Sequence, residues 1–382
     1  MPDFIFKISP NIILGSYTSS RLGQFVREWG TRYMLILDPV LEEFGTSSKI
    51  EESLKDRSIN YFVFDEIPQA PDTTVVAQAL RLAREAHVHG VISVGGPKTA
   101  NIGRAVCALF NESHDIYDFT EGAQPTSGSL PFITVPTTIR DSFLFSDTSP
   151  LIDARSRQLK MLKLQPALCR LALFDPNLTV TLTESQSVSM ILHTVCIAIE
   201  AYISQKANFF SDTIIEKAVE LLGGALTEPS ALTASSPKEQ LALEGGCMTS
   251  LGVSSSSIGA GTLLAHAINA RYKLATSLTA TVFLPYIIED AAKYKTEKLA
   301  KLARIMHAAA DTSSNEAAVS ALAETIRSKI AAANLPARLK DLSVSIEQLA
   351  LAAEDAAKLD CMNAMPRSMT ADDLFDIIKQ AF

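Results

Sequence analysis

Residues 91–98 read Val-Ile-Ser-Val-Gly-Gly-Pro-Lys, an apolar run of strand length followed by two glycines and a helix start. The following segment places Ile102, Val106 and Leu109 on one helical face. Glycines at the end of a strand let backbone N–H groups approach a phosphate, and a helix N-terminus adds partial positive charge. The stretch therefore predicts a phosphate-binding turn. The alternative is a plain strand–helix turn that needs glycine only for its backbone shape.

Similar strand-like runs occur on either side of this stretch. Apolar segments of strand length stand at 33–37, 59–64 and 132–135, and amphipathic helical segments lie between them. Strands that are buried on both faces and joined by amphipathic helices predict a parallel sheet with helical crossovers. We expect residues 1–178 to form an α/β dinucleotide-binding domain.

The pattern changes to helical periodicity in the second half. Thr181 and Glu184 have capping-box spacing, which predicts a helix from there to about residue 204. A second helix is expected to end at Gly223-Gly224, and residues 286–356 show helical periodicity with a break near Pro336. We expect residues 179–382 to form an all-α domain.

Composition excludes several classes of protein. The net charge is −8 and the pI about 5.4, which leaves no basic field for binding nucleic acid or an anionic membrane surface. The five cysteines are scattered, so we expect reduced thiols and a cytoplasmic protein. No signal peptide is visible, and we expect no apolar stretch of the ~18 residues that a membrane span needs. These features indicate a soluble enzyme that acts on a small molecule.

Polar residues follow three of the expected strands. Asp38 ends one apolar strand, where an acid commonly binds a ribose and favours NAD over NADP; the alternative is a turn-forming Asp before Pro39. Thr137 and Thr138 end another strand and offer hydroxyl groups, with simple turn chemistry as the alternative. Lys98 could add a full positive charge at the glycine turn.

Two histidines stand out because they lie in apolar helical segments. His193 lies between Leu192 and Val195, and His266 lies within Leu-Leu-Ala-His-Ala-Ile. Each is either a buried core residue with satisfied hydrogen bonds or a functional residue beside the expected cofactor domain.

Five motifs, taken in order, show a resemblance to a known family. They are Gly95-Gly96-Pro97-Lys98, Pro136-Thr137-Thr138, Lys160, Asp175-Pro176-Asn177-Leu178 and Glu200-Ala201-Tyr202. Their order and separation resemble the iron-containing alcohol dehydrogenase family, which has a dehydroquinate synthase-like fold. The resemblance covers nearly the whole chain.

The resemblance implies an N-terminal dinucleotide-binding domain, a helical C-terminal domain and an active site in the cleft between them. It implies that Lys160 and the glycine turn bind the cofactor, together with Thr137 and Thr138. NAD(H) is expected rather than NADP(H) because of Asp38. It also implies a homodimer or larger homo-oligomer.

The metal-binding positions of the family are changed in this chain. Family members hold iron or zinc with an Asp and a His four residues apart, and with two later histidines. Here those four positions correspond to His193, Ile197, Thr262 and Thr276, while His266 matches a cleft histidine that is not a ligand. The glycine turn also departs from the family, with Pro97 for its third Gly, Lys98 for its Ser and Asn101 for its downstream Asp.

Two functions follow from these changes. The first is an NAD(P)-dependent oxidoreductase that interconverts an alcohol and a carbonyl compound without the usual tightly bound iron, with His193 or His266 as proton donor. These two histidines are also the remaining candidates for holding a divalent ion, if an acidic side chain completed the set. The second is a non-redox descendant of the fold, either a lyase-type enzyme or a nucleotide-binding regulatory or structural protein.

Overall fold

The computed structural model describes residues 6, 8–179, 182–227 and 232–382. The chain divides into two compact units, Met1–Thr181 and Leu182–Phe382. This division lies three residues beyond the boundary expected from the sequence, after residue 178.

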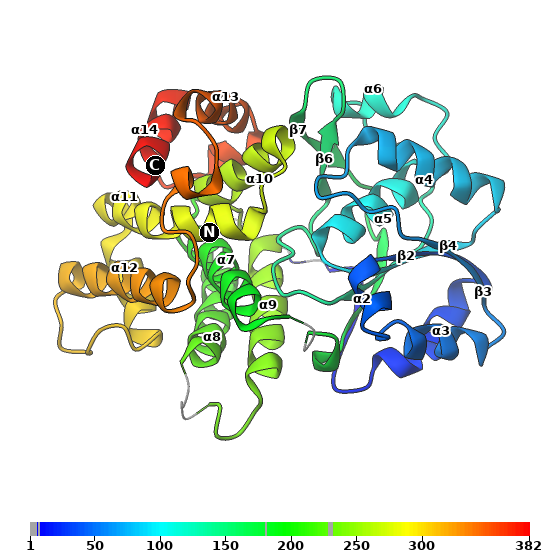
Figure 1. The fold of residues 1–382 in the computed structure, drawn as a ribbon, viewed down its shortest axis with the longest axis horizontal. Coiled ribbons are helices and arrows are strands. Elements are labelled where there is room, and N and C mark those ends of the chain that lie inside the picture. The colour runs from blue at the N-terminus through cyan, green and yellow to red at the C-terminus, as the bar shows by residue number, and fades with distance from the viewer. Residues whose placement is uncertain (1–5, 7, 180–181, 228–231) are drawn as a thin grey trace. The chain divides into compact units, whose positions relative to one another are not determined.

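The first unit is built on a parallel sheet, as the sequence predicts. Among the described residues six strands form it in the order β1-β8-β5-β4-β2-β3, and every neighbouring pair is parallel (Figure 1). Its strands are β1 (Asn11–Leu14), β2 (Arg32–Leu37), β3 (Asn60–Phe64), β4 (Gly90–Gly95), β5 (Phe132–Pro136) and β8 (Cys169–Phe174).

Helices cover both faces of this sheet, so that alternate strand residues pack in opposite directions. Helices α4 (Thr73–Glu85) and α5 (Pro97–Leu109) lie on one face, and α1 (Leu22–Val26) and α3 (Ser48–Lys55) on the other (Figure 1). The first core includes Met34, Ile36, Val91, Val76, Ala79, Ile102 and Val106; the second includes Leu35, Leu37, Ile92, Leu22, Val26, Ile50 and Leu54. Short helices also occur at α2 (Pro39–Glu43) and α6 (Ile116–Thr120), with 3₁₀ turns at Ser19–Arg21, Arg27–Trp29 and Pro176–Leu178.

Sequence periodicity did not reveal one pair of strands in this unit. Strands β6 (Thr148–Asp153) and β7 (Gln158–Lys163) form an antiparallel hairpin. Leu151 and Leu162 of the hairpin join the core beneath α4 and α5. Polar residues interrupt both strands, and this hides their alternation.

The second unit is helical, as predicted. Its helices are α7 (Glu184–Ile203), α8 (Phe209–Leu226), α9 (Lys238–Ser254), α10 (Ala260–Tyr272), α11 (Thr276–Ile305), α12 (Asn315–Ala332), α13 (Ile346–Ala357) and α14 (Ala371–Ala381). Two 3₁₀ turns stand at Leu339–Leu342 and Asp360–Ala364, and the break expected near Pro336 is present between α12 and α13.

Two expected helix ends are wrong. The first is the start of α7. The sequence predicts Thr181 as its cap, and this residue lies outside the described part of the chain. Thr183 instead accepts the backbone N–H of Gln186, and the Gln186 side chain accepts the N–H of Thr183. The second is α8, which continues through Gly223 and Gly224 because each packs closely against a neighbour, Met306 and Leu232 respectively.

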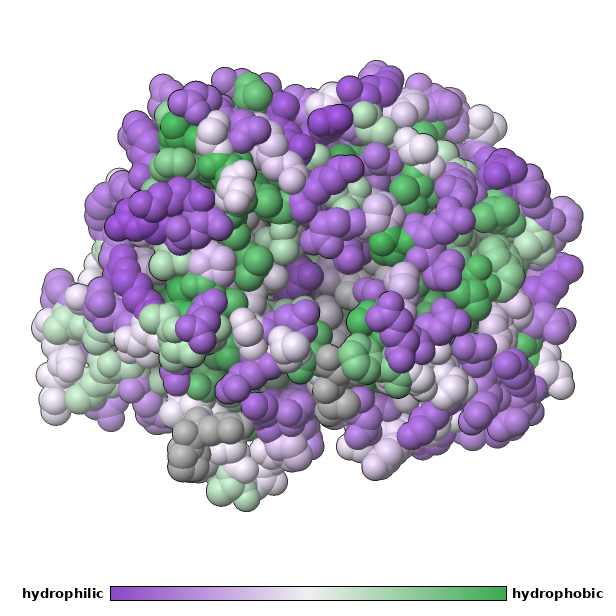
Figure 2. All heavy atoms as spheres, in the orientation of Figure 1, coloured by the Kyte–Doolittle hydropathy of each residue, from purple (hydrophilic) through white to green (hydrophobic). Residues whose placement is uncertain are grey.

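Helix α7 corrects one further expectation. Its length and mean hydropathy of 1.4 meet the criteria for a membrane span, although 78% of that window is buried inside the protein. A helix with charged and polar residues that is buried in this way is typical of a protein core. Figure 2 shows hydrophilic side chains over most of the face drawn, with smaller groups of hydrophobic ones between them.

Candidate functional site

The ends of three neighbouring strands bring most of the predicted cofactor residues together. Leu37 of β2 pairs with Val94 of β4, and Gly95 pairs with Pro136 of β5. Beyond those pairs, the N–H of Asp38 donates to Val94 O at 3.0 Å and the N–H of Thr137 donates to Gly95 O at 3.0 Å. Asp38, the glycine turn and Thr137 therefore share the carboxyl edge of the sheet, where open α/β sheets bind ligands.

Both glycines of the turn are required by close packing. Gly95 has a φ of +148°, and a methyl group on it would lie 2.8 Å from Thr99 Oγ1 and 3.0 Å from Asp38 Cβ. A methyl group on Gly96 would lie 3.3 Å from Thr138 Oγ1. The side chains of Thr99, Asp38 and Thr138 therefore pack directly against the glycine backbone, which leaves no room for a Cβ atom at Gly95.

Helix α5 begins directly on this turn. Gly96 is its N-cap residue, Pro97 is its first residue, and Thr99 Oγ1 donates to Gly96 O at 2.8 Å. Proline suits this position because its missing N–H has no partner in the first turn of a helix. The partial positive charge of the helix N-terminus therefore lies at the glycine turn.

Two buried hydroxyl groups near the turn have no hydrogen-bond partner within the described part of the chain. They are Thr138 Oγ1, next to Gly96, and Ser93 Oγ, on β4. Buried polar atoms are nearly always paired in folded proteins, so an exception at a sheet edge points to a missing ligand or solvent partner. This observation fits a bound dinucleotide.

Asp38 also serves the turn that follows it. Its Oδ1 accepts the N–H of Val40 at 3.4 Å and so caps α2. The structure thus contains the turn role that the sequence left as an alternative. A cap through one oxygen is compatible with a ribose contact through the other.

Lys160 lies outside the main sheet. It pairs with Leu151 in the hairpin and belongs to a different sheet from the glycine turn. The main sheet therefore does not bring this predicted cofactor residue to its carboxyl edge.

A buried ion pair that the sequence did not suggest holds the loop after β5. Arg104 of α5 hydrogen-bonds to Asp141, and their side chains are 2% and 7% exposed. Arg104 also donates to Asn101 Oδ1 at 2.8 Å, and Asp141 Oδ1 accepts the N–H of Phe143 at 3.0 Å. The pair fixes the segment that follows Thr138 to the helix that begins at the glycine turn. The one sign of this ion pair in the sequence is an arginine between Gly103 and Ala105 in an otherwise apolar helical segment.

The helical unit contains the positions that the resemblance matches to the family's metal ligands. On α7, His193 is 1% exposed, and Ile197, four residues later on the same face, is equally buried. Thr262 on α10 is fully buried, while Thr276, at the start of α11, is partly exposed. Over the residues that the structure describes, no three His, Cys, Asp or Glu side chains gather as a metal site. This donor set does not fit iron or zinc.

A buried carboxylate joins α7 to α10 at this place. Glu200 accepts backbone N–H groups from Gly259 at 3.0 Å, Gly261 at 2.6 Å and Thr262 at 3.2 Å. Burial raises the pKa of Glu200, and the Thr262 hydroxyl and these N–H groups oppose that rise. The carboxylate thus satisfies the first turn of α10 in place of a side-chain cap.

The two candidate histidines lie on these two neighbouring helices. A methyl group on Gly261 would lie 3.3 Å from Cys196 Sγ, so the two helices nearly touch there. His193 lies three residues before Cys196 and His266 five residues after Gly261, which corresponds to about 5 and 8 Å along the helix axes. His266 is partly exposed, whereas His193 is buried.

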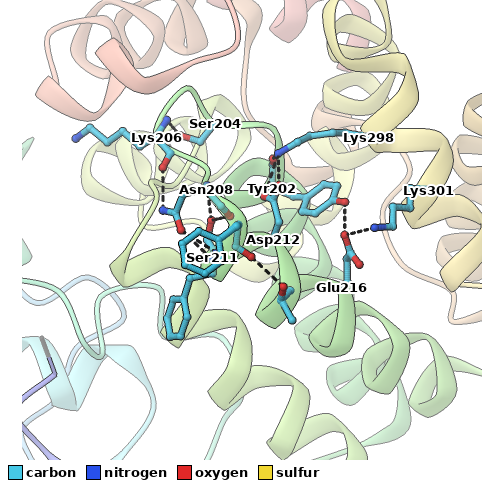
Figure 3. Close-up of polar contacts among 12 residues, drawn as sticks. Tyr202, Ser204, Lys206, Asn208, Ser211, Asp212, Glu216, Lys298 and Lys301 are labelled. Carbon is cyan, nitrogen blue, oxygen red and sulfur yellow. Dashed lines mark hydrogen bonds and ion pairs between the residues drawn. The ribbon is translucent and has the colours of Figure 1, made fainter. Parts of the chain in front are cut away.

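Tyr202, two residues beyond Glu200, anchors the same C-terminal end of α7. Its hydroxyl donates to Glu216 Oε1 at 2.6 Å, and Lys298 Nζ donates to Tyr202 O at 2.8 Å and to Asp212 at 2.8 Å (Figure 3). Lys298 also lies 4.5 Å from the centre of the Tyr202 ring. The Glu-Ala-Tyr motif is therefore a packing motif that fixes α7 to α8, α10 and α11.

One pocket of about 410 Å³ lies in the helical unit. Glu200, Tyr294 and Arg367 are among its lining residues, whereas neither candidate histidine lines it. Arg367 is already paired with Asp290 at 3.3 Å and Asp373 at 2.9 Å.

The buried ion pair gives a stability prediction. We expect Arg104→Met to lower the free energy of unfolding by about 3–5 kcal/mol, because it leaves the buried Asp141 carboxylate without its cation. The double variant Arg104→Met/Asp141→Leu should recover most of this loss, since two apolar side chains need no charge partner. Urea denaturation of both variants measures the difference.

Arg81→Met is the matched control, because Arg81 pairs with Glu85 at the surface, where their side chains are 66% and 60% exposed. Such a pair contributes less than about 1 kcal/mol. If Arg104→Met costs no more than this control, the ion pair does not hold the loop.

Known proteins share both units. The sequence profile described as "Iron-containing alcohol dehydrogenase" matches residues 9–176, and "Fe-containing alcohol dehydrogenase family, C-terminal" matches residues 185–382. Lactaldehyde reductase of Escherichia coli K12 is 24% identical over 353 residues, which is 91% of each chain.

Two solved structures show the same fold. A 1,3-propanediol oxidoreductase has a TM-score of 0.90 at 21% identity, covering 99% of this chain and 100% of its own. Sulfoacetaldehyde reductase from Bifidobacterium kashiwanohense, solved in complex with NAD+, has a TM-score of 0.84 at 16% identity, covering 100% of this chain and 99% of its own. The profile matches extend over both units and confirm the resemblance seen in the motifs: the chain belongs to the iron-containing alcohol dehydrogenase family.

Proposed function

We propose that this protein is an NAD(P)-dependent oxidoreductase that interconverts an alcohol and a carbonyl compound, prefers NAD(H), and works without tightly bound iron or zinc. The observation that carries the proposal is the glycine turn at the carboxyl edge of the sheet, with the buried Thr138 hydroxyl beside it. Family membership supports the redox chemistry, and the relative solved with NAD+ supports the cofactor class.

Different residues of the chain contact different parts of the dinucleotide in this proposal. Gly95 and Gly96 offer backbone N–H groups to the pyrophosphate at the start of α5, next to Pro97 and Lys98. Asp38 accepts hydrogen bonds from the adenosine ribose, which favours NAD(H). Thr137, Thr138 and Lys160 are the remaining proposed contacts. The bound cofactor supplies or accepts a hydride.

We infer that no metal is bound tightly, because too few side chains at the matched positions can act as ligands. A stable iron or zinc site needs about three or four protein ligands, and isoleucine at 197 offers none. Threonine at 262 offers only a neutral hydroxyl, which is a weak ligand for either metal. His193 and His266 alone would supply only two ligands.

Without a metal, a protein group must stabilise the oxygen of the substrate. When a carbonyl is reduced, negative charge develops on that oxygen, and a histidine can donate a proton to it. We propose His193 and His266 for this role because both lie near the contact between α7 and α10. The partly exposed imidazole of His266 is the more accessible of the two.

The assembly and the compartment are also part of the proposal. Family resemblance supports a homodimer or larger homo-oligomer, which sedimentation equilibrium measures. All five cysteines are free thiols, and this supports a cytoplasmic protein.

Dinucleotide binding is the first outcome to measure. We expect NADH to bind saturably in a fluorescence titration, and Thr138→Val to weaken it about 5–10-fold, because one hydrogen bond contributes roughly 1 kcal/mol. Thr213→Val is the control, since Thr213 is exposed on α8 and bonds only to Phe209 O. Failure of both NADH and NADPH to bind at millimolar concentration would contradict the proposal.

Metal content gives an independent outcome. After dialysis against a chelator, we expect elemental analysis to find far less than one iron or zinc per chain, with NADH affinity unchanged. Two restored ligands, Ile197→His and Thr262→His, should raise zinc content if the backbone still has the family's arrangement. Stoichiometric metal in the unchanged protein after dialysis would show that another ligand set exists.

Substitution of the two histidines distinguishes a catalytic role from a packing role. We expect His193→Ala and His266→Ala each to lower turnover about 10²–10⁴-fold while NADH affinity stays the same. His307→Asn is the control, because His307 is exposed and its φ of +56° suits asparagine. Turnover per folded molecule and melting temperature are measured together. If the variants only melt earlier, both histidines are packing residues.

A further inference from the structure

A lysine stands close in the chain to the glycine turn and to the carboxylate at the end of β2. Asp38 follows β2, Lys98 is the second residue of α5, and Arg140 follows β5. Asp38 and Lys98 carry opposite formal charges, −1 and +1. The charge of Asp141 acts on Arg140, and Asp141 is also paired with Arg104.

The backbones of these residues leave neighbouring strands at the same edge of the sheet. Asp38 lies level with Gly95, since its N–H donates to Val94 O at 3.0 Å and its Cβ would lie 3.0 Å from a methyl group on Gly95. Lys98 follows in the first turn of the helix that starts there, and its Nζ reaches Gln69 Oε1 at 3.5 Å.

Electrostatics agree with this placement. Burial lowers the pKa of Lys98, the Asp38 carboxylate opposes that shift, and the Arg140 guanidinium adds to it. Burial also lowers the pKa of Arg140 to about 10, a value at which it is still charged at neutral pH.

The charges of Asp38 and Lys98 affect whether the site accepts NAD(H) or NADP(H). An isolated carboxylate at the end of β2 repels a 2′-phosphate, and this repulsion normally excludes NADP(H). A lysine in the first turn of the next helix offsets part of that repulsion, and cationic groups form strong, charge-assisted hydrogen bonds with phosphate.

We propose that Lys98 is a specificity-determining residue, which offsets Asp38 and lets the site accept the 2′-phosphate of NADP(H) as well as NAD(H). The inference rests on the proposed function, because it needs a dinucleotide at the glycine turn. It limits the expected preference for NAD(H) to a modest one.

Dissociation constants for NADH and NADPH test the inference directly. For the unchanged protein we expect the ratio of the NADPH constant to the NADH constant to stay below about ten. Lys98→Met keeps the length of the side chain but removes the charge, and should raise this ratio about tenfold. In the double variant Asp38→Asn/Lys98→Met the ratio should fall back, because the carboxylate that Lys98 offsets is gone.

Lys163→Met is the matched control, since Lys163 is exposed at the end of β7 and its loss should leave the ratio unchanged. Equal weakening of both dinucleotides by Lys98→Met would overturn the inference, because it would place Lys98 on the shared pyrophosphate. A ratio above about one hundred in the unchanged protein would overturn it as well. Binding of neither dinucleotide to the unchanged protein would instead remove the proposed function on which it rests.

Discussion

The hydrogen-bonded alignment of β2, β4 and β5 is the constraint on which the proposed site depends. Because Leu37 pairs with Val94 and Gly95 pairs with Pro136, all three strands end at one level. The chain then leaves the sheet at Asp38, Gly96 and Thr137. A slip of one residue in any of these strands would turn its side chains to the opposite face and separate these groups. The two hydrophobic cores fix that register, since alternate residues of each strand pack against helices on opposite faces.

In the helical unit, hydrogen bonds rather than metal ligands join the described helices around the positions matched to the family's metal site. Glu200 accepts three backbone N–H groups at the start of α10 and so ties that helix to α7 without a metal ion. Tyr202 and Lys298 secure the end of α7 to α8 and α11. The positions on α7 that the resemblance matches to metal ligands, His193 and Ile197, lie in the turns before Glu200, so they differ from the family's residues while these hydrogen bonds stay in place.

The sequence predicts the parts of the structure that local physics determines. The strand at 91–94, the glycine turn and the amphipathic helix after it were visible because apolar periodicity and glycine placement are local signals. The hairpin of β6 and β7 was missed because polar residues mask its alternation. The helix end expected at Gly223-Gly224 was wrong, since tertiary packing against Met306 overrides the tendency of glycine to end a helix. The Arg104–Asp141 pair joins residues 37 positions apart, and no local pattern reveals such a contact.

The central claim is that hydride transfer takes place in this protein without a bound metal ion. The most direct measurement uses NADH deuterated at the transferred position, an aldehyde such as lactaldehyde or propanal, and protein dialysed against a chelator, with the alcohol product analysed by mass spectrometry. The account predicts that one deuterium enters the alcohol, at a rate that added iron or zinc does not change. Transfer that appears only after metal is restored, or no transfer to any aldehyde tested while NADH binds, would contradict it.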